Sequence, residues 1–292
     1  MDTNKPLAVF PWDAIVATGA LGHPSTLLLS QVKAWSTYDY YGRLNSEAAL
    51  ADAAAAFVAE NSNGDAGLLG AYFRRFLALA REDSAAAASA LLLRPAGSDQ
   101  AAAMATAACW LTVRMSKPTD DFIVPLWHRD GCMFTCTCTC TCTAGPSAAA
   151  VPHAKYAVSL LGPGTRVMAP SPQVNKAITA SDAAVRVAAE AAMQKEVVAG
   201  RAWAWLLPEV DEDRIRADLA RQLAGCGEQV GFEPGQVIRF TWGQDDSPVH
   251  SEPDLSGGDR VFVSVLFGTE DELRGMAEFR EVDYHESVPV PS

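Results

Sequence analysis

A histidine and an aspartate two residues apart are the first residues in this chain that could do chemistry. The segment Trp127-His128-Arg129-Asp130 closes an apolar run, residues 122–126. Side chains alternate along a strand, so His128 and Asp130 would point to the same face if this run is a strand. Together they supply two groups of a 2-His-1-carboxylate triad, which holds non-haem Fe(II) and leaves coordination positions open. Because a single His-x-Asp arises by chance in many chains, the prediction depends on a second histidine.

His250 supplies that second histidine, and Arg260 accompanies it. His250 follows a predicted strand at 237–242 and a polar turn at 243–249. Ten residues later, Arg260 opens the run Val261-Phe262-Val263-Ser264-Val265-Leu266-Phe267. Such a nearly continuous apolar run is typical of a strand that is buried on both faces. A guanidinium on this strand is costly to bury without an anion, so we expect Arg260 to bind one.

Each of these residues also has a purely structural interpretation. His128 could donate a hydrogen bond to Asp130, and His250 could be an ordinary loop residue. Arg260 could form a salt bridge with one of three aspartates, Asp130, Asp246 or Asp259. Taken singly, these interpretations are at least as good as the functional ones. The spacing, the strand context and the turns agree for all of the residues together, and this agreement favours an iron site at His128, Asp130 and His250.

Four short motifs carry a resemblance to a known family. They are Trp127-His128-x-Asp130, Gly162-Pro163-Gly164-Thr165, Val249-His250-x-x-Pro253 and Arg260-x-x-x-Ser264. This pattern resembles the Fe(II)- and 2-oxoglutarate-dependent oxygenases over roughly residues 120–268. In their residues and spacing, the motifs are most similar to an uncharacterised family of bacterial and fungal proteins within or near that group.

The resemblance implies a fold, a cofactor and an activity. The fold would be α+β, with a double-stranded β-helix (jelly-roll) core and helices packed on it. Fe(II) would be held by His128, Asp130 and His250, and Arg260 would pair with the far carboxylate of 2-oxoglutarate. The reaction would be hydroxylation or demethylation of a substrate that the sequence does not identify, with no catalytic residue beyond the metal ligands.

Two further residues are candidates for the co-substrate pocket, and two features depart from the family pattern. Tyr156 lies in a predicted strand, and its phenol could anchor a carboxylate. Many members of the family carry a hydroxyl two residues after the arginine, where this chain has Phe262; Ser264 lies on the same strand face as Arg260 and could replace it. His250 lies 122 positions after His128, a long separation for the family, and the departures put 2-oxoglutarate itself in question.

Charge and composition limit the partners. The 292 residues carry a net charge of -12, which repels phosphate backbones at long range and makes nucleic acid an unexpected partner. The overall charge suits cationic or neutral substrates better, whether small molecules or proteins. We find no apolar run of membrane-spanning length and no secretory signal, so a cytoplasmic protein is expected. The oligomeric state cannot be read from the sequence.

Cysteine is concentrated in one low-complexity segment. Five of the seven cysteines fall between Cys132 and Cys142, and four of them alternate with threonine over residues 135–143. A strand here would place the thiols on one face, which suggests a Zn or Cu(I) site. Strict alternation, however, spaces the sulfurs along a line that cannot close a tetrahedron around one ion. A repeat-expanded loop is the favoured interpretation.

The elements that would position the site fall into three regions. Residues 1–115 are expected to be a helical support, with helices at 46–60, at about 68–79 and at 99–114; the tyrosines at 38–41 favour a packed surface turn over a substrate-facing rim. Residues 116–268 are expected to form the jelly-roll core, with the Cys/Thr insert at 132–150 and a helical insert at 171–225. Residues 269–292 should hold a short helix, opened by a Thr269–Glu272 capping box, and a tail.

Three hypotheses remain open at this point. The first is an iron-dependent oxygenase. The second is a non-enzymatic cupin-like protein that binds a metal or a small ligand without turnover. The third is a thiol-rich metal-binding or redox protein that acts through Cys132–Cys142.

Overall fold

A six-stranded antiparallel sheet forms the centre of the protein. The computed structural model describes residues 5–11, 13, 27–91, 103–130, 153–198, 212–243 and 247–288. The strands of this large sheet are hydrogen-bonded in the order β1-β7-β4-β9-β3-β2. Their bounds are β1 Leu7–Phe10, β2 Ser36–Arg43, β3 Ala108–Ser116, β4 His153–Leu161, β7 Val237–Trp242 and β9 Arg260–Gly268. The longest strands, β3, β4 and β9, are adjacent to one another, so the sheet is built around β9.

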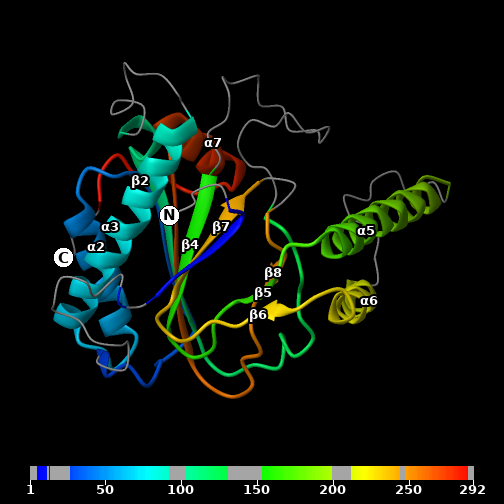
Figure 1. The fold of residues 1–292 in the computed structure, drawn as a ribbon, viewed down its shortest axis with the longest axis horizontal. Coiled ribbons are helices and arrows are strands. Elements are labelled where there is room, and N and C mark those ends of the chain that lie inside the picture. Colours follow the sequence, from blue (N-terminus) through cyan, green and yellow to red (C-terminus); the bar gives the residue numbers. More distant parts are fainter. Residues whose placement is uncertain are drawn as a thin grey trace.

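A second, smaller antiparallel sheet lies on one side of the large sheet (Figure 1). Its strands are β6 (Gln229–Val230), β5 (Arg166–Met168) and β8 (His250–Ser251), paired in that order. His128 extends it through an isolated bridge to His250, in which each backbone N–H donates to the other carbonyl at 2.9 Å. The two histidines singled out from the sequence are therefore neighbours on adjacent segments of the small sheet.

Two helices cover the opposite face of the large sheet (Figure 1). They are α2 (Glu47–Glu60), which begins at the N-cap Ser46, and α3 (Ala66–Leu91). The main hydrophobic core lies between these helices and the sheet, and it includes Tyr72, Phe73 and Phe76 from α3. Burial of these large side chains fixes which face of each strand points away from the small sheet.

The remaining helices lie around the small sheet and at one end of the large sheet. α5 (Pro172–Val198) and α6 (Glu212–Ala224) pack together beside the small sheet and extend away from it in Figure 1, and Trp127 is buried in the cluster at their base. α7 (Glu270–Phe279) begins with the predicted capping box between Thr269 and Glu272. Its buried residues pack on the aromatic residues Tyr41, Trp110 and Trp242.

The N-terminal region differs from its prediction. Residues 1–115 were expected to form only a helical support, but they contribute β1, β2 and β3 to the large sheet. The expected helix at 99–114 is wrong: a turn at 103–105 is followed by β3, whose residues are almost all buried. Tertiary burial between β2 and β9 overrides the weak helical preference of this segment. Tyr40 and Tyr41 are buried on the edge strand β2 and do not form a surface turn.

One prediction around the site strands also needs correction. Residues 117–127 form no strand, and Ile123, Val124 and Leu126 are exposed. The apolar run 122–126, which contains Pro125, therefore leads to the site as a loop, since proline lacks the N–H that a sheet ladder uses. After the turn at Gly162–Thr165 the chain crosses to the small sheet, where Arg166–Met168 forms β5. The core strands 153–161, 237–242 and 260–268 are confirmed within one or two residues.

The chain is thus a mixed α+β protein with mostly antiparallel sheets. The Cys/Thr segment, and with it the hypothesis of a thiolate site, lies outside the described residues. Of the proposed helical insert, α5 and α6 are described and residues 199–211 are not. Among the described helices, none is long and apolar enough to cross a membrane.

Candidate metal centre

A cavity of about 120 Å³ lies between the inner face of the large sheet and the small sheet. Alternate residues of β3 and β9 form its wall on the large sheet, and His128, Asp130 and β8 face them. It is lined by Trp110, Thr112, Arg114, His128, Asp130, Lys155, Thr165, Phe240, His250, Ser251, Glu252, Arg260, Phe262, Ser264 and Arg280. The cavity therefore contains both predicted parts of the site, the metal triad and the arginine.

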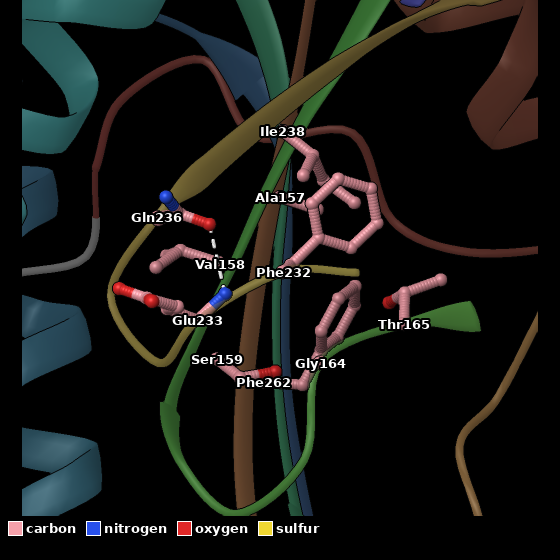
Figure 2. A pocket seen from close by; sticks show the side chains of 10 residues that line it. All are labelled: Ala157, Val158, Ser159, Gly164, Thr165, Phe232, Glu233, Gln236, Ile238 and Phe262. Carbon is pink, nitrogen blue, oxygen red and sulfur yellow. Dashed lines mark hydrogen bonds between the residues drawn. The ribbon is translucent and has the colours of Figure 1, made fainter. Parts of the chain in front are cut away.

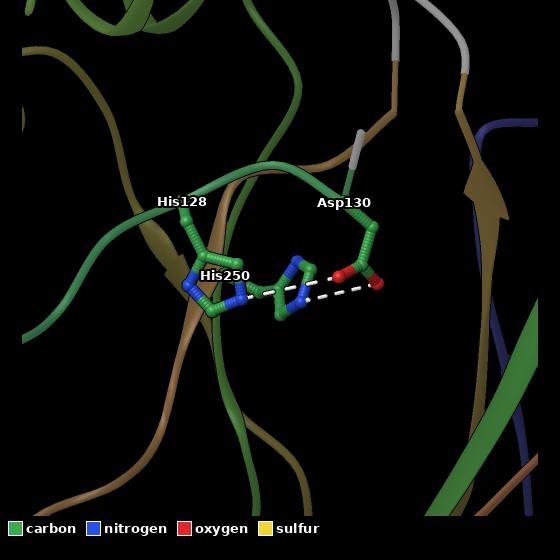
Figure 3. A group of neighbouring side chains, drawn as sticks. All are labelled: His128, Asp130 and His250. Atoms are coloured by element: carbon green, nitrogen blue, oxygen red, sulfur yellow. Dashed lines mark ion pairs between the residues drawn. The ribbon is translucent and has the colours of Figure 1, made fainter. Parts of the chain in front are cut away.

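His128, Asp130 and His250 converge on one point (Figure 3). Asp130 Oδ1 lies 4.0 Å from His128 Nε2, and Asp130 Oδ2 lies 3.5 Å from His250 Nε2. One ligand atom from each residue falls within 4.8 Å of the others. His-x-Asp places both side chains on the same side of the segment, and the bridge to His250 brings the third group beside them. Three such ligands on one side of a point form a facial triad.

The backbone sets the tautomer of both histidines. His128 Nδ1 lies 2.9 Å from the carbonyl of Leu126, and His250 Nδ1 lies 3.1 Å from the carbonyl of Pro248. A carbonyl only accepts, so each Nδ1 carries a proton, and in the neutral form of each ring Nε2 presents the lone pair. Histidine ligands of metals are usually oriented by such a bond from the other ring nitrogen. Both imidazoles are therefore prepared to bind a metal through Nε2.

The electrostatics of the triad suit a cation. Burial lowers the pKa of His250 to about 4, so its imidazole is neutral at neutral pH. Burial acts to raise the pKa of Asp130, but the neighbouring Lys155, His250 and His128 outweigh it and the pKa is lowered. Asp130 Oδ2 is buried and accepts no hydrogen bond from the described residues. The neutral imidazole of His250, the ionised carboxylate of Asp130 and the imidazole of His128 form a donor set that fits Fe(II).

Arg260 is buried at one end of the cavity without a carboxylate partner. Only 4% of the residue is exposed, and its guanidinium donates to Pro163 O at 3.2 Å and to Thr165 Oγ1 at 3.1 Å. In the described part of the chain, no carboxylate oxygen lies within 4.0 Å of it. Burial lowers the pKa of Arg260 to about 10, which leaves it charged at neutral pH. Its hydrogen bonds go to neutral acceptors, and Glu252 is the carboxylate within electrostatic range, so Arg260 is a candidate binding site for an anion.

The turn Gly162–Thr165 explains how Arg260 is held. Gly162 has φ +75°, and a Cβ there would lie 2.4 Å from Asp259 O, so only glycine permits this close approach. Because the turn lies this close to β9, Pro163 O and Thr165 Oγ1 are within hydrogen-bond distance of the Arg260 guanidinium. Phe262 packs under Arg260, with its ring centre 4.5 Å from the guanidinium carbon. Figure 2 shows Phe262, Phe232 and Ile238 around a small pocket, which shares Thr165 and Phe262 with the cavity.

Lys155 lies beside the triad at the other end. Its Nζ is 3.5 Å from Asp130 Oδ2, and its side chain is 14% exposed. The ammonium also lies over three aromatic rings, with centres at 5.0 Å for Trp110, 4.9 Å for Trp242 and 5.9 Å for Phe240. Burial lowers the pKa of Lys155, and Asp130 opposes this shift. Lys155 therefore orients the carboxylate of a candidate metal ligand.

Most of the predicted site residues come together, and one does not. Arg260 and Ser264 line the same cavity as His128, Asp130 and His250. Tyr156 points to the opposite face of the large sheet, where its hydroxyl donates to Asp83 at 2.8 Å under helix α3. The prediction of Tyr156 as a co-substrate residue is therefore not supported by its position, because Lys155, its neighbour in β4, takes the inward face. Trp127 packs in the small-sheet cluster and Arg129 bonds to Asn175, as expected for the face away from the triad.

The sequence reasoning missed Lys155, Arg114, Glu252 and Arg280. Lys155 and Arg114 each carry a charge inside an otherwise apolar strand, which is a signal that could have been used. Glu252 forms an ion pair with Arg114 at 3.3 Å on the cavity wall. Arg280 follows helix α7, and no sequence pattern connects that position to the site. The cavity lining holds four cationic side chains of Lys or Arg and two carboxylates, although the whole chain is acidic.

Comparisons of this chain with protein-family models, with curated proteins and with solved structures find no match. The functional argument therefore depends on the geometry of the site.

Proposed function

We propose that this protein is a non-haem Fe(II)- and 2-oxoglutarate-dependent oxygenase that hydroxylates or demethylates a small-molecule substrate. One observation carries the proposal. His128 and His250 donate from Nδ1 to backbone carbonyls and so direct Nε2 toward the carboxylate of Asp130, inside a cavity that also holds Arg260. A triad with open positions beside a buried anion site is the arrangement that this chemistry uses.

The strand order supports a jelly-roll core within this proposal. From β3 to β9 the chain passes to the small sheet at His128, to the large sheet at β4, and to the small sheet at β5 and β6. It then returns to the large sheet at β7, enters the small sheet at β8 and ends in the large sheet at β9. Two facing antiparallel sheets filled in this alternating way correspond to a double-stranded β-helix, in which ligands bind between the sheets.

Each residue has a defined task in the proposed reaction. Bound Fe(II) would supply oxidative chemistry with dioxygen, coupled to decarboxylation of the co-substrate. His128, Asp130 and His250 would bind the metal, and Lys155 would hold the Asp130 carboxylate in place. Arg260 would bind the far carboxylate of 2-oxoglutarate, with Ser264 beside it. Phe262 and Phe240 would exclude water and so strengthen these charge interactions.

Anaerobic titration with Fe(II) and 2-oxoglutarate tests the proposal. The wild-type protein should develop a weak visible charge-transfer band, and His128→Ala and His250→Ala should abolish it. Arg260→Gln should keep the Fe(II) site but weaken 2-oxoglutarate about 10- to 100-fold, because charged hydrogen bonds to the carboxylate are lost. His285→Ala is the matched control, since His285 lies outside the cavity and should leave the band unchanged.

Turnover separates an enzyme from a binding protein. Release of succinate and CO₂ from 2-oxoglutarate in air, dependent on both histidines, would support an oxygenase. Fe(II) binding without any consumption of 2-oxoglutarate or O₂ would instead favour the non-enzymatic cupin-like protein. Absence of Fe(II) binding to the wild-type chain would contradict both.

A further inference from the structure

We propose that the Trp110 end of the cavity is a subsite for the carboxylate of a small organic-acid substrate, bound by Lys155 and Arg280. This inference rests on the proposed function for the identity of the metal, and it adds the chemical class of the substrate. The sequence left the substrate unassigned, and the net charge of -12 pointed to a cationic or neutral one.

The first observation is a pair of cations around one indole. Lys155 Nζ lies 5.0 Å from the ring centre of Trp110, and the guanidinium carbon of Arg280 lies 4.2 Å from it. Trp110 is also stacked on Tyr41 and meets Trp242 edge to face, so its position is fixed by packing. Both cations line the cavity, and both lie over the same indole ring.

The second observation is the way the fold delivers Arg280. Helix α7 is anchored at its start by the capping box and by His153, whose Nε2 lies 3.1 Å from Glu272. Its apolar side packs on the aromatic cluster of Tyr41, Trp110 and Trp242. Arg280 is the C-cap residue, where the helix dipole favours a cation, and it donates to the hydroxyl of Tyr41 at 3.1 Å. The guanidinium is therefore held at this place by the helix.

The third observation is the distance from the co-substrate end. Arg260 pairs with Ser116 across the sheet, whereas Trp110 and Lys155 both pair with Leu266. Six residues of β3 separate the two levels, or about 20 Å along the strand. The two cationic ends therefore lie at different levels of the sheet, so a carboxylate bound by Lys155 and Arg280 would be a second ligand beside 2-oxoglutarate at Arg260.

The triad lies at the Trp110 level, which places the subsite next to the metal. Lys155 contacts Asp130, and the ring of Phe240 lies 4.8 Å from that of His250. A carboxylate held by Lys155 and Arg280 would put the neighbouring carbons of the same molecule in front of the triad. The faces of Trp110 and Phe240 offer apolar contact to those carbons. We therefore infer a monocarboxylate with a short apolar or aromatic body.

Three molecules of one shape and different charge test this inference. Benzoate, benzamide and benzamidine are compared by ligand-observed NMR at millimolar concentration, on the full chain loaded with Zn(II) in place of Fe(II). Benzoate should bind, and benzamide and benzamidine should bind at least about tenfold more weakly, because only the carboxylate pairs with both cations. Equal binding of all three, or no binding of benzoate, would overturn the inference.

Matched variants locate the subsite. Arg280→Met should weaken benzoate about tenfold, and Lys155→Met should weaken it similarly while Lys155→Arg restores part of the affinity. Arg274→Met is the control, because Arg274 lies on the same helix over the ring of Tyr284 but does not line the cavity. Thermal unfolding confirms that each variant is folded. An Arg274→Met variant that weakened benzoate as strongly as Arg280→Met would overturn the assignment.

A competition experiment separates this inference from the proposed function. Benzoate and 2-oxoglutarate should bind together, and Arg260→Gln should weaken only 2-oxoglutarate. Displacement of benzoate by 2-oxoglutarate would place both at one site and overturn the subsite. If benzoate binds through Arg280 while 2-oxoglutarate never binds, the organic-acid subsite stands and the oxygenase proposal fails.

Discussion

Two buried arginines on opposite faces of the large sheet have different kinds of partner. Arg239 lies under helix α3, and its Nε is 3.0 Å from Asp83 Oδ2. Arg260 lies in the cavity and contacts only neutral acceptors among the described residues. Both are almost fully buried, at 3% and 4% exposure. An internal carboxylate forms an ion pair with Arg239, whereas Arg260 forms no ion pair with a carboxylate among the described residues and is the arginine that we propose binds an anion.

Removal of Asp83 should produce the largest loss of stability. Asp83→Ala leaves the Arg239 charge buried without its carboxylate and also removes the acceptor of Tyr156, which should cost about 3–5 kcal/mol. Urea unfolding measures the change. Arg260→Met is the comparison and should change the free energy of unfolding by less than about 1 kcal/mol, since the nearby carboxylate of Glu252 keeps its ion pair with Arg114. Equal losses for both variants would remove the distinction between the two arginines.

Acid should destabilise the cavity face through His250. Its pKa falls from 6.5 in the unfolded chain to about 4 in the folded chain, so the unfolded state binds more protons between these values. Stability should therefore fall as the pH falls from about 6.5 to 4, by at most about 3 kcal/mol from this group. Urea unfolding of the metal-free chain at several pH values measures the slope. His250→Gln should flatten it, and an unchanged slope would contradict the assignment.

Substitution of Gly162 should lower stability and displace the hydrogen-bond acceptors of Arg260. Gly162→Ala places a Cβ against Asp259 O at a positive φ, which should cost about 1–3 kcal/mol of folding free energy. The shifted turn should also weaken 2-oxoglutarate, because Pro163 O and Thr165 Oγ1 move away from Arg260. Gly257→Ala is the matched control, since nothing lies within 4 Å of its added Cβ. Full affinity in Gly162→Ala would show that the turn does not position Arg260.

Thr165→Val should have the smallest effect. It removes one hydrogen bond to the Arg260 guanidinium at nearly constant shape, which should cost about 1 kcal/mol and weaken 2-oxoglutarate about fivefold. Calorimetric titration with the Zn(II)-loaded protein measures this change. Thr112→Val, on the same cavity but bonded to Asp39, should leave 2-oxoglutarate affinity unchanged. Equal losses in both variants would point to a general change in the cavity.

Much of the site could be predicted from local patterns. The spacing of His128 and Asp130 predicted that their side chains lie on the same side of the segment. Arg260 was a candidate site residue because it is a cation at the start of an apolar strand. The capping box at Thr269 and the strands around residues 155, 240 and 264 were also readable. Each of these depends on a repeat or a pairing within a few residues, which the sequence displays directly.

Other features depend on contacts distant in sequence. Residues 108–116 form a strand because β2 and β9 pair with them on both sides. Tyr156 and Lys155 are both plausible ligand contacts by residue type, and which of them faces the cavity depended on where helix α3 packs. Arg280 reaches the cavity only because α7 folds back onto Tyr41 and Trp110.

By itself the sequence determined the chemical inventory: a His-x-Asp, a later histidine, an arginine on an apolar strand and an acidic overall charge. The tertiary structure decided which of these groups meet, and it gathered Lys155, Arg114, Arg260 and Arg280 around one cavity in an acidic chain. The reason is physical. Net charge is a sum over the whole chain, whereas a bound ligand senses the few charges that burial brings within reach, where water screens them least.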